Sequence, residues 1–229
     1  MSKIVIAIDG FSSTGKSTIA KQLAKQLNYI YVDTGAMYRA VTYFALEQQY
    51  IGEGFFKEEA LIQNLDSIHI TFKFNPDLGF AEVYLNGENI EAAIRTLEVS
   101  KYVSPVATLS EVRRKLVEQQ QLMGKDKGIV MDGRDIGTVV FPEAELKIFM
   151  TASAETRATR RYQELLGRGH QLSYEEVLEN VTTRDHIDST REDSPLVKAE
   201  DAVEIDNSDL SIETQLDRLV FMAKTLIEE

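Results

Sequence analysis

Short apolar runs alternate with amphipathic stretches along most of the chain, a pattern typical of βα units built on a parallel sheet. Five such runs predict largely buried strands, at residues 3–8, 29–32, 128–131, 146–150 and 202–205. Apolar residues at helical spacing predict helices over residues 16–27, 35–49, 106–123, 154–166, 173–190 and 211–227. The pattern therefore predicts an α/β fold, in which helices flank a five-stranded parallel sheet.

Residues 56–100 interrupt this alternation. Between residues 68 and 74 apolar and polar side chains alternate one by one, which is typical of a strand with one buried face. A second short strand is expected at 81–85, and Asn86-Gly87 is a strong signal for a hairpin turn that leads to a third. The simplest interpretation is a small antiparallel β-containing insertion in the α/β core.

The charge of the chain excludes some classes of partner. Its 229 residues include 25 Lys and Arg against 37 Asp and Glu, which gives a formal charge of −12. A binder of nucleic-acid polymers or of anionic membranes would need a broad basic surface, so neither partner is expected. Any polyanion that the chain binds must be small, and local clusters of basic residues must bind it.

Other features of the composition narrow the chemistry further. No apolar run approaches the roughly 20 residues that a membrane span needs, and Asp9 interrupts the N-terminal run. The chain has no cysteine, which excludes disulfides, thiol catalysis and cysteine-based metal sites. Its three histidines, at 69, 170 and 186, lack the spacing of metal ligands. These features predict a cytoplasmic protein.

Residues 10–17 match the phosphate-binding pattern G-x-x-x-x-G-K-[ST], between a predicted strand and a predicted helix. Backbone N–H groups and the N-terminus of the helix would form a concave site for phosphate oxygens. Lys16 would reach the β- and γ-phosphates, and the Ser17 hydroxyl would bind Mg²⁺. The alternative is a turn that merely joins strand and helix, but both the motif and its context favour a nucleoside triphosphate.

Three further segments carry polar residues at the ends of predicted strands or on a helix. Residues 32–39 end in Arg39, and residues 129–135 place Asp132 and Asp135 on either side of Arg134. On the helix over 173–190 and just past its end, Arg184, Asp188 and Arg191 fall at spacings that share one face. Ligands bind at the carboxyl ends of strands in open α/β sheets, so these segments are candidates for a second substrate.

Taken in order, these motifs resemble those of the bacterial cytidylate kinase family, P-loop enzymes that transfer the γ-phosphoryl group of ATP to CMP or dCMP. The matching segments are residues 10–17, 33–39, 94–99, 132–142, 157–161, 184–191 and 194–196. The resemblance implies a single P-loop kinase domain over 1–229, a CMP-binding insertion at 56–100 and a lid segment at 155–170. The expected oligomeric state is a monomer.

The resemblance also implies roles for individual residues. Those expected to bind ATP are Gly10, Phe11, Ser12, Ser13, Thr14, Gly15, Lys16, Ser17, Thr18, Arg157 and Arg161. Those expected to bind CMP or dCMP are Thr34, Tyr38, Arg39, Ser104, Arg113, Arg134, Asp135, Arg184, Asp188 and Arg191. The expected catalytic residues are Lys16, Arg134, Arg157 and Arg191. Ser17 and Asp132 are expected to organise Mg²⁺, with Asp33 as the alternative to Asp132.

Within the acceptor set, Arg39, Arg134 and Arg191 would hold the CMP phosphate, and Arg184 and Asp188 would face the sugar. Ser104, Arg113 and Asp135 would contact cytosine. An ionised Asp135 accepts from the exocyclic amino group and Arg113 donates to O2 or N3, whereas uracil would leave these groups unpaired. A relative that acts on UMP, AMP or a non-nucleotide acceptor remains the enzymatic alternative.

A nucleotide-dependent switch is the alternative outside catalysis, but the chain lacks the Asn-Lys pair expected of a guanine-selective GTPase. Phe11 departs from the family pattern, which usually has proline at this position. We expect Phe11 to change the packing around the loop and to leave ATP binding intact.

Overall fold

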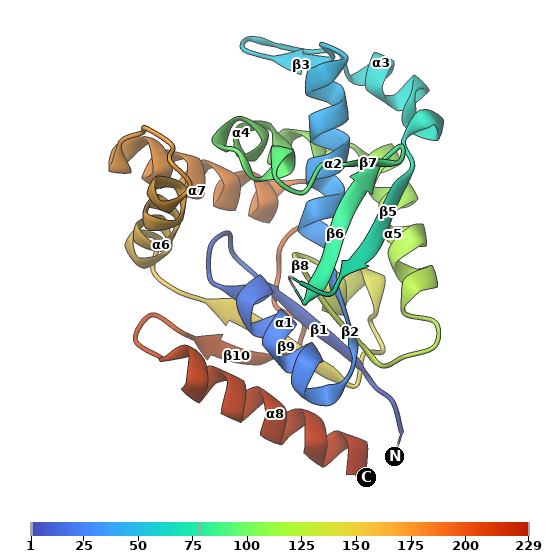
Figure 1. Cartoon of the computed structure of the whole chain (residues 1–229), viewed down its shortest axis with the longest axis vertical. Coiled ribbons are helices and arrows are strands. Elements are labelled where there is room, and N and C mark those ends of the chain that lie inside the picture. The colour runs from blue at the N-terminus through green and yellow to red at the C-terminus, as the bar shows by residue number, and fades with distance from the viewer. Residues whose placement is uncertain (1, 78, 229) are drawn as a thin grey trace. The chain divides into compact units, whose positions relative to one another are not determined.

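The computed structural model describes residues 2–77 and 79–228, so both ends of the predicted domain and residue 78 of the predicted insertion lie outside the described residues. The chain divides into two compact units (Figure 1). The first comprises Met1–Val32 and Met123–Glu229, and the second comprises Asp33–Leu122. The phosphate loop belongs to the first unit, and the small antiparallel sheet belongs to the second.

The first unit is built on a five-stranded sheet in the order β10-β9-β1-β8-β2. Its strands are β1 (Val5–Gly10), β2 (Ile30–Asp33), β8 (Ile129–Gly133), β9 (Leu146–Thr151) and β10 (Val203–Asp206). β1 pairs in parallel with both β8 and β9, and every residue of β1 is buried. The predicted α/β fold and its five-stranded parallel sheet are confirmed. The apolar sequence of β1 fits its place in the sheet, because a strand buried on both faces needs apolar residues throughout.

Four helices complete this unit: α1 (Lys16–Leu27), α6 (Ala154–Gly167), α7 (Tyr174–Thr190) and α8 (Ile212–Glu228). Apolar side chains of α1 and α8, among them Leu23 and Leu219, pack in one core with Ile6 and Ile8 of β1. α7 begins at a capping box, in which the Glu176 N–H donates to Ser173 Oγ at 3.1 Å and the Ser173 N–H donates to Glu176 Oε2 at 2.7 Å. The helices predicted for these segments are therefore confirmed.

A short π-helix (Ile136–Val140) follows β8, and the sequence pattern gave no sign of it. π-helical turns are rare and often occur near functional sites. This one directly follows the segment that carries Arg134 and Asp135.

The second unit combines four helices with two small sheets. The helices are α2 (Thr34–Glu47), α3 (Glu58–Gln63), α4 (Leu97–Val106) and α5 (Ser110–Met123), the last residue of which lies in the first unit. The three-stranded antiparallel sheet contains β5 (Ile70–Asn75), β6 (Phe80–Leu85) and β7 (Glu88–Asn89), and the two-stranded sheet pairs β3 (Ile51–Gly52) with β4 (Phe55–Phe56). The predicted antiparallel sheet is confirmed.

The turn between β6 and β7 has the predicted chemistry, since Asn86 and Gly87 both adopt positive φ angles, of 50° and 90°. The helix predicted over 106–123 is wrong at its start, because α4 ends at Val106 and α5 begins at Ser110. The Thr108 hydroxyl donates to the Pro105 carbonyl at 2.7 Å and so competes with helical hydrogen bonding at the break. α3, α4 and the β3–β4 hairpin were not predicted.

Within the described residues, no helix is both long and apolar enough to cross a membrane.

Candidate active site

The phosphate loop runs from the end of β1 into α1, and close backbone contact sets its start. Gly10 has φ +143°, and a Cβ at this position would lie 2.0 Å from the Met150 carbonyl oxygen of β9. Gly15, with φ +92°, is the N-cap residue of α1. Both glycines therefore occupy positions that other residues would strain, as a phosphate loop between strand and helix requires.

Lys16 folds back over its own loop. Its Nζ donates to the Phe11 carbonyl at 2.5 Å and to Thr14 Oγ1 at 3.3 Å, and only 5% of the residue is exposed. Burial, reinforced by the nearby charge of Arg134, lowers the pKa of Lys16 well below its usual value. An anion bound in the loop would favour the charged amine, so Lys16 suits a phosphate contact.

Phe11 packs against the same part of the first unit. Its ring lies 5.2 Å from the guanidinium carbon of Arg157 and makes an edge-on contact with Phe149, with ring centroids 6.0 Å apart. A cation over an aromatic face is an attractive contact that proline could not supply. Phe11 therefore adds a stacking partner for Arg157 beside the loop.

Ser17 and Asp132 meet at the carboxyl ends of the central strands. Ser17 Oγ donates to Asp132 Oδ2 at 2.9 Å, and the Tyr31 hydroxyl donates to Asp132 Oδ1 at 2.8 Å. A hydroxyl and a carboxylate are the hard oxygen ligands that Mg²⁺ prefers when it keeps several waters and binds substrate phosphates. Among the described residues, no group of three or more His, Cys, Asp or Glu could hold a metal.

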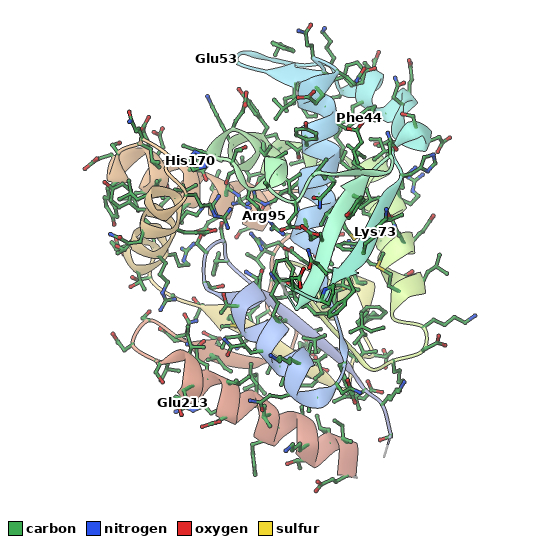
Figure 2. All side chains as sticks on the ribbon, in the orientation of Figure 1. Phe44, Glu53, Lys73, Arg95, His170 and Glu213 are labelled. Atoms are coloured by element: carbon green, nitrogen blue, oxygen red, sulfur yellow. The ribbon has the colours of Figure 1, made fainter. Side chains whose placement is uncertain are left out.

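Asp33, the alternative carboxylate, is engaged within the second unit. It accepts from Arg95 Nη1 and from the Ala36 N–H, both at 2.9 Å, and thereby caps α2. Burial alone would raise the pKa of Asp33, but Arg95 outweighs burial and lowers it. Arg95, labelled in Figure 2, also pairs with Glu91 at 2.8 Å. The carboxylate of Asp33 therefore serves an ion pair and a helix cap, which makes Asp132 the better fit for a metal.

Arginines and aspartates of the first unit form two ion pairs that are largely shielded from solvent. Arg134 Nε donates to Asp188 Oδ2 at 2.9 Å, and Arg191 Nη2 lies 3.9 Å from Asp135 Oδ1. Burial would lower the pKa of Arg134, but Asp188 outweighs it, so that the pKa is raised. The first unit therefore brings together four of the predicted acceptor residues in ion pairs, of which Arg134 is half-buried and the other three residues are buried.

Arg157 and Arg184 reach the loop itself. Arg157 Nη1 donates to the Ser12 carbonyl at 3.1 Å and Nη2 pairs with Asp185 at 2.6 Å, while Arg184 Nη1 donates to Ser12 Oγ at 2.9 Å. Burial and the neighbouring Arg134 lower the pKa of Arg184 to about 10, so Arg184 stays charged at neutral pH. Two guanidinium groups thus contact the phosphate loop, and a guanidinium group can also donate to phosphate oxygens.

Other predicted ATP residues lie near these. Arg161 pairs with Glu164 at 2.9 Å on α6. Thr14 is fully buried, Ser13 is half-buried with φ +61°, and Thr18 is exposed in the first turn of α1. The predicted ATP-binding residues therefore all belong to the first unit.

The remaining predicted acceptor residues belong to the second unit. The Arg113 guanidinium of α5 lies 5.6 Å from the ring centroid of Tyr38 on α2, and Arg39 Nη1 donates to the Ile94 carbonyl at 3.2 Å. Thr34 begins α2, and Ser104 lies on α4. Ser104 Oγ is buried with no hydrogen-bond partner among the described residues, which marks a polar atom available to a ligand.

Asp9 is a polar residue of this region that sequence analysis did not single out. It is 5% exposed and accepts from the Ile136 N–H at 2.8 Å and from the Gly137 N–H at 2.7 Å, so it ties the end of β1 to the π-helix after Asp135. Burial raises its pKa to about 7, although the two backbone hydrogen bonds oppose the shift. The signal available in the sequence was a carboxylate that interrupts a buried apolar run directly before Gly10.

The raised pKa of Asp9 predicts a specific dependence of stability on pH. Between about pH 4 and pH 7, Asp9 holds a proton in the folded chain, whereas in the unfolded chain, where it has the usual Asp pKa of 3.8, it has released that proton. The contribution of Asp9 to the free energy of unfolding should therefore fall as pH rises from about 4 to about 7, by about 1 kcal/mol per pH unit. Urea unfolding of the unmodified chain and of Asp9→Asn, between pH 5 and 8, measures this.

The difference in unfolding free energy between the two proteins should shrink toward pH 7 and then level off. Asp77→Asn on the exposed surface of the second unit serves as the control for the exchange of Asp for Asn. A difference that stays constant from pH 5 to 8 contradicts the burial of a proton on Asp9.

Comparison with known proteins extends over nearly the whole chain. Residues 6–225 match a family model described as cytidylate kinase. A curated cytidylate kinase of Flavobacterium johnsoniae is 67% identical over 228 residues, covering 100% of this chain and 99% of that protein. One from Flavobacterium psychrophilum is 68% identical over 215 residues, covering 94% of this chain and 95% of that protein.

A solved structure of an uncharacterised protein from Eubacterium ventriosum aligns with 98% of this chain and 99% of that chain, at a TM-score of 0.50 and 11% identity. At this identity the likeness concerns the fold alone.

Proposed function

Because the chain belongs to the cytidylate kinase family, we propose that it transfers the γ-phosphoryl group of ATP to CMP or dCMP, giving ADP and CDP or dCDP. The chain is a phosphotransferase of the nucleotide kinase type. The observation that carries the proposal is the match along the full chain, together with a phosphate loop whose lysine, serine and glycines are all present. Its place in metabolism is the supply of pyrimidine nucleoside diphosphates.

The first unit would bind ATP. The backbone N–H groups of residues 10–18 would surround the β- and γ-phosphates, and Lys16, Arg157 and Arg161 would add positive charge. Ser17 and Asp132 would hold Mg²⁺, which when bound neutralises charge on the β- and γ-phosphate oxygens. In support, Ser17 Oγ lies 2.9 Å from Asp132 Oδ2, and both side chains offer only oxygen ligands.

Arginines would position the acceptor phosphate. We assign Arg39, Arg134 and Arg191 to the CMP phosphate, since a guanidinium group binds phosphate oxygens in pairs and stays charged. In-line transfer needs two phosphates held close together and charge compensation on the moving group, and little covalent help. Lys16, Arg134, Arg157 and Arg191 would supply that compensation as the catalytic residues.

The sugar and base would be read by buried polar groups. Arg184 and Asp188 would face the sugar, and Thr34 would line the acceptor site. Ser104, Arg113 and Asp135 would recognise cytosine. The buried hydroxyl of Ser104, which has no partner among the described residues, supports a polar ligand in the second unit. Tyr38 lies against the Arg113 guanidinium and would hold it in place.

The insertion and the lid belong to the same proposal. Residues 56–100 would contribute to CMP binding, and residues 155–170 would close over ATP and exclude water. A monomeric state and a cytoplasmic location stay predictions.

The production of ADP from ATP and Mg²⁺ with CMP, dCMP, UMP, AMP or no acceptor tests the proposal. We expect turnover with CMP and dCMP at least about 100-fold above that with UMP or AMP, because uracil and adenine leave the polar groups of the base site unpaired. A folded Lys16→Ala variant from the same preparation should lose this activity, which excludes a contaminating kinase. Turnover confined to another acceptor, or none from protein that binds ATP, would contradict the proposal.

The cytosine assignment predicts a selective effect of Asp135→Asn. The amide replaces one carboxylate acceptor with a donor, so kcat/KM for CMP should fall about 100-fold while the Kd for ATP stays within about twofold. Steady-state kinetics and calorimetric titration of ATP measure the two effects. Asp209→Asn, an exposed residue of the same type, is the matched control. Unchanged turnover of CMP in Asp135→Asn would show that the base is recognised elsewhere.

A further inference from the structure

Asn207, the residue after β10, lies at the centre of a buried hydrogen-bond network. Only 2% of it is exposed. Its Nδ2 donates to the Thr14 carbonyl of the phosphate loop at 2.7 Å and to Gln215 Oε1 of α8 at 2.9 Å. Its Oδ1 and its carbonyl accept from Arg160 of α6, at 3.0 Å and 2.8 Å. One side chain thus joins the loop to two helices.

The orientation of this amide follows from its partners. Arg160 can only donate, so the Asn207 amide oxygen must face Arg160 and the amide nitrogen must face Thr14. The Asn207 N–H donates to the Thr151 carbonyl at 2.9 Å, which fixes the backbone of Asn207 to the end of β9. Gln215 is itself held, since its Nε2 donates to the Leu210 carbonyl at 3.0 Å. The donor aimed at the loop is therefore rigid.

A fixed Thr14 carbonyl fixes the next N–H group. In a planar trans peptide the C=O and N–H bonds point in opposite directions. A Thr14 carbonyl bound by Asn207 therefore directs the Gly15 N–H to the opposite side of the loop. Gly15 is the N-cap residue of α1, where the N–H groups of a phosphate loop bind phosphate oxygens.

We propose that Asn207 is a positioning residue for the ATP phosphates, which acts by holding the Thr14 carbonyl so that the Gly15 N–H faces the ligand. The proposal rests on the proposed function, since it assumes that the loop binds ATP. Arg160 Nη1, 3.3 Å from the same carbonyl, supports this orientation. Asn207 itself touches no phosphate in this account and acts only through the loop.

Two substitutions separate the lost donor from an added charge. Asn207→Asp keeps the shape and the acceptor for Arg160 but cannot donate to Thr14, and Asn207→Ala removes the donor without adding a negative charge. Calorimetric titration of ATP, inorganic tripolyphosphate and CMP into each full-length variant measures the effect. Both variants should bind ATP and tripolyphosphate about tenfold more weakly, with CMP affinity within about twofold of the unmodified chain.

Tripolyphosphate distinguishes the positioning of the loop from a contact with adenine. Weaker ATP binding with unchanged tripolyphosphate binding would overturn the proposal in favour of a base contact. Weaker binding in Asn207→Asp alone would overturn it in favour of simple charge repulsion. Leu219→Ala, a core substitution in α8 that removes no hydrogen-bonding group of the network, shows whether lowered stability alone weakens ATP binding, and an equal loss there would also overturn the proposal.

The outcomes for Asn207 and for the proposed function are distinguishable. An unmodified chain that phosphorylates CMP, together with variants of unchanged ATP affinity, would overturn the role of Asn207 and leave the kinase intact. An unmodified, folded chain that binds neither ATP nor tripolyphosphate would overturn both.

Discussion

The phosphate loop holds its shape because side chains bind its carbonyl oxygens. Arg157 donates to the Ser12 carbonyl, and Asn207 and Arg160 donate to that of Thr14. Within the loop, Thr14 Oγ1 and Lys16 Nζ donate to the Phe11 carbonyl. Each bound carbonyl turns the following N–H the other way, so the donors that a phosphate requires are oriented before it arrives. The first unit is organised around this constraint.

Charge is the second part of that organisation. Arg157 and Arg184, which reach the loop, are buried, and Arg134 is half-buried. Such arginines need counter-charges, because an unpaired buried charge is costly. Asp185 pairs with Arg157, and Asp188 pairs with Arg134. The chain as a whole carries a formal charge of −12, yet the guanidinium groups of Arg157, Arg160 and Arg184 all donate to one loop. A small polyanion can therefore bind to an acidic protein, while a long one would meet repulsion outside this region.

Much of the fold could be predicted from the sequence, and the features that were not predicted have physical causes. Four of the five strands are largely apolar runs and were predictable for that reason, and Asn86-Gly87 revealed the turn between β6 and β7. β10 was expected to be largely buried, but it is an edge strand in which only Ile205 is buried. α4 was missed because it is short and carries Pro105 and several β-branched residues, which are weak helix formers. Asp9 and Asn207 could not be found from spacing, since Asp9 accepts from N–H groups 127 and 128 residues away and Asn207 donates to a loop carbonyl 193 residues away.

The candidate site was predictable in type more than in geometry. The motifs identified the loop, the paired acids and the arginines, but not which acid each arginine binds. Only the folded chain shows that Asp132 accepts a hydrogen bond from Ser17 and that Asp33 pairs with Arg95. Pairing of this kind depends on which strand ends lie side by side, and sequence periodicity does not encode that.

We infer that the phosphate loop is ordered by contacts within the protein before nucleotide binds. Backbone ¹⁵N relaxation of the ligand-free chain tests it directly at residues 11–16. If the loop is ordered in this way, its order parameters should be near 0.85, equal to those of β1 and unchanged by ATP. Values below about 0.6 in the free chain that rise only when ATP is added would contradict it.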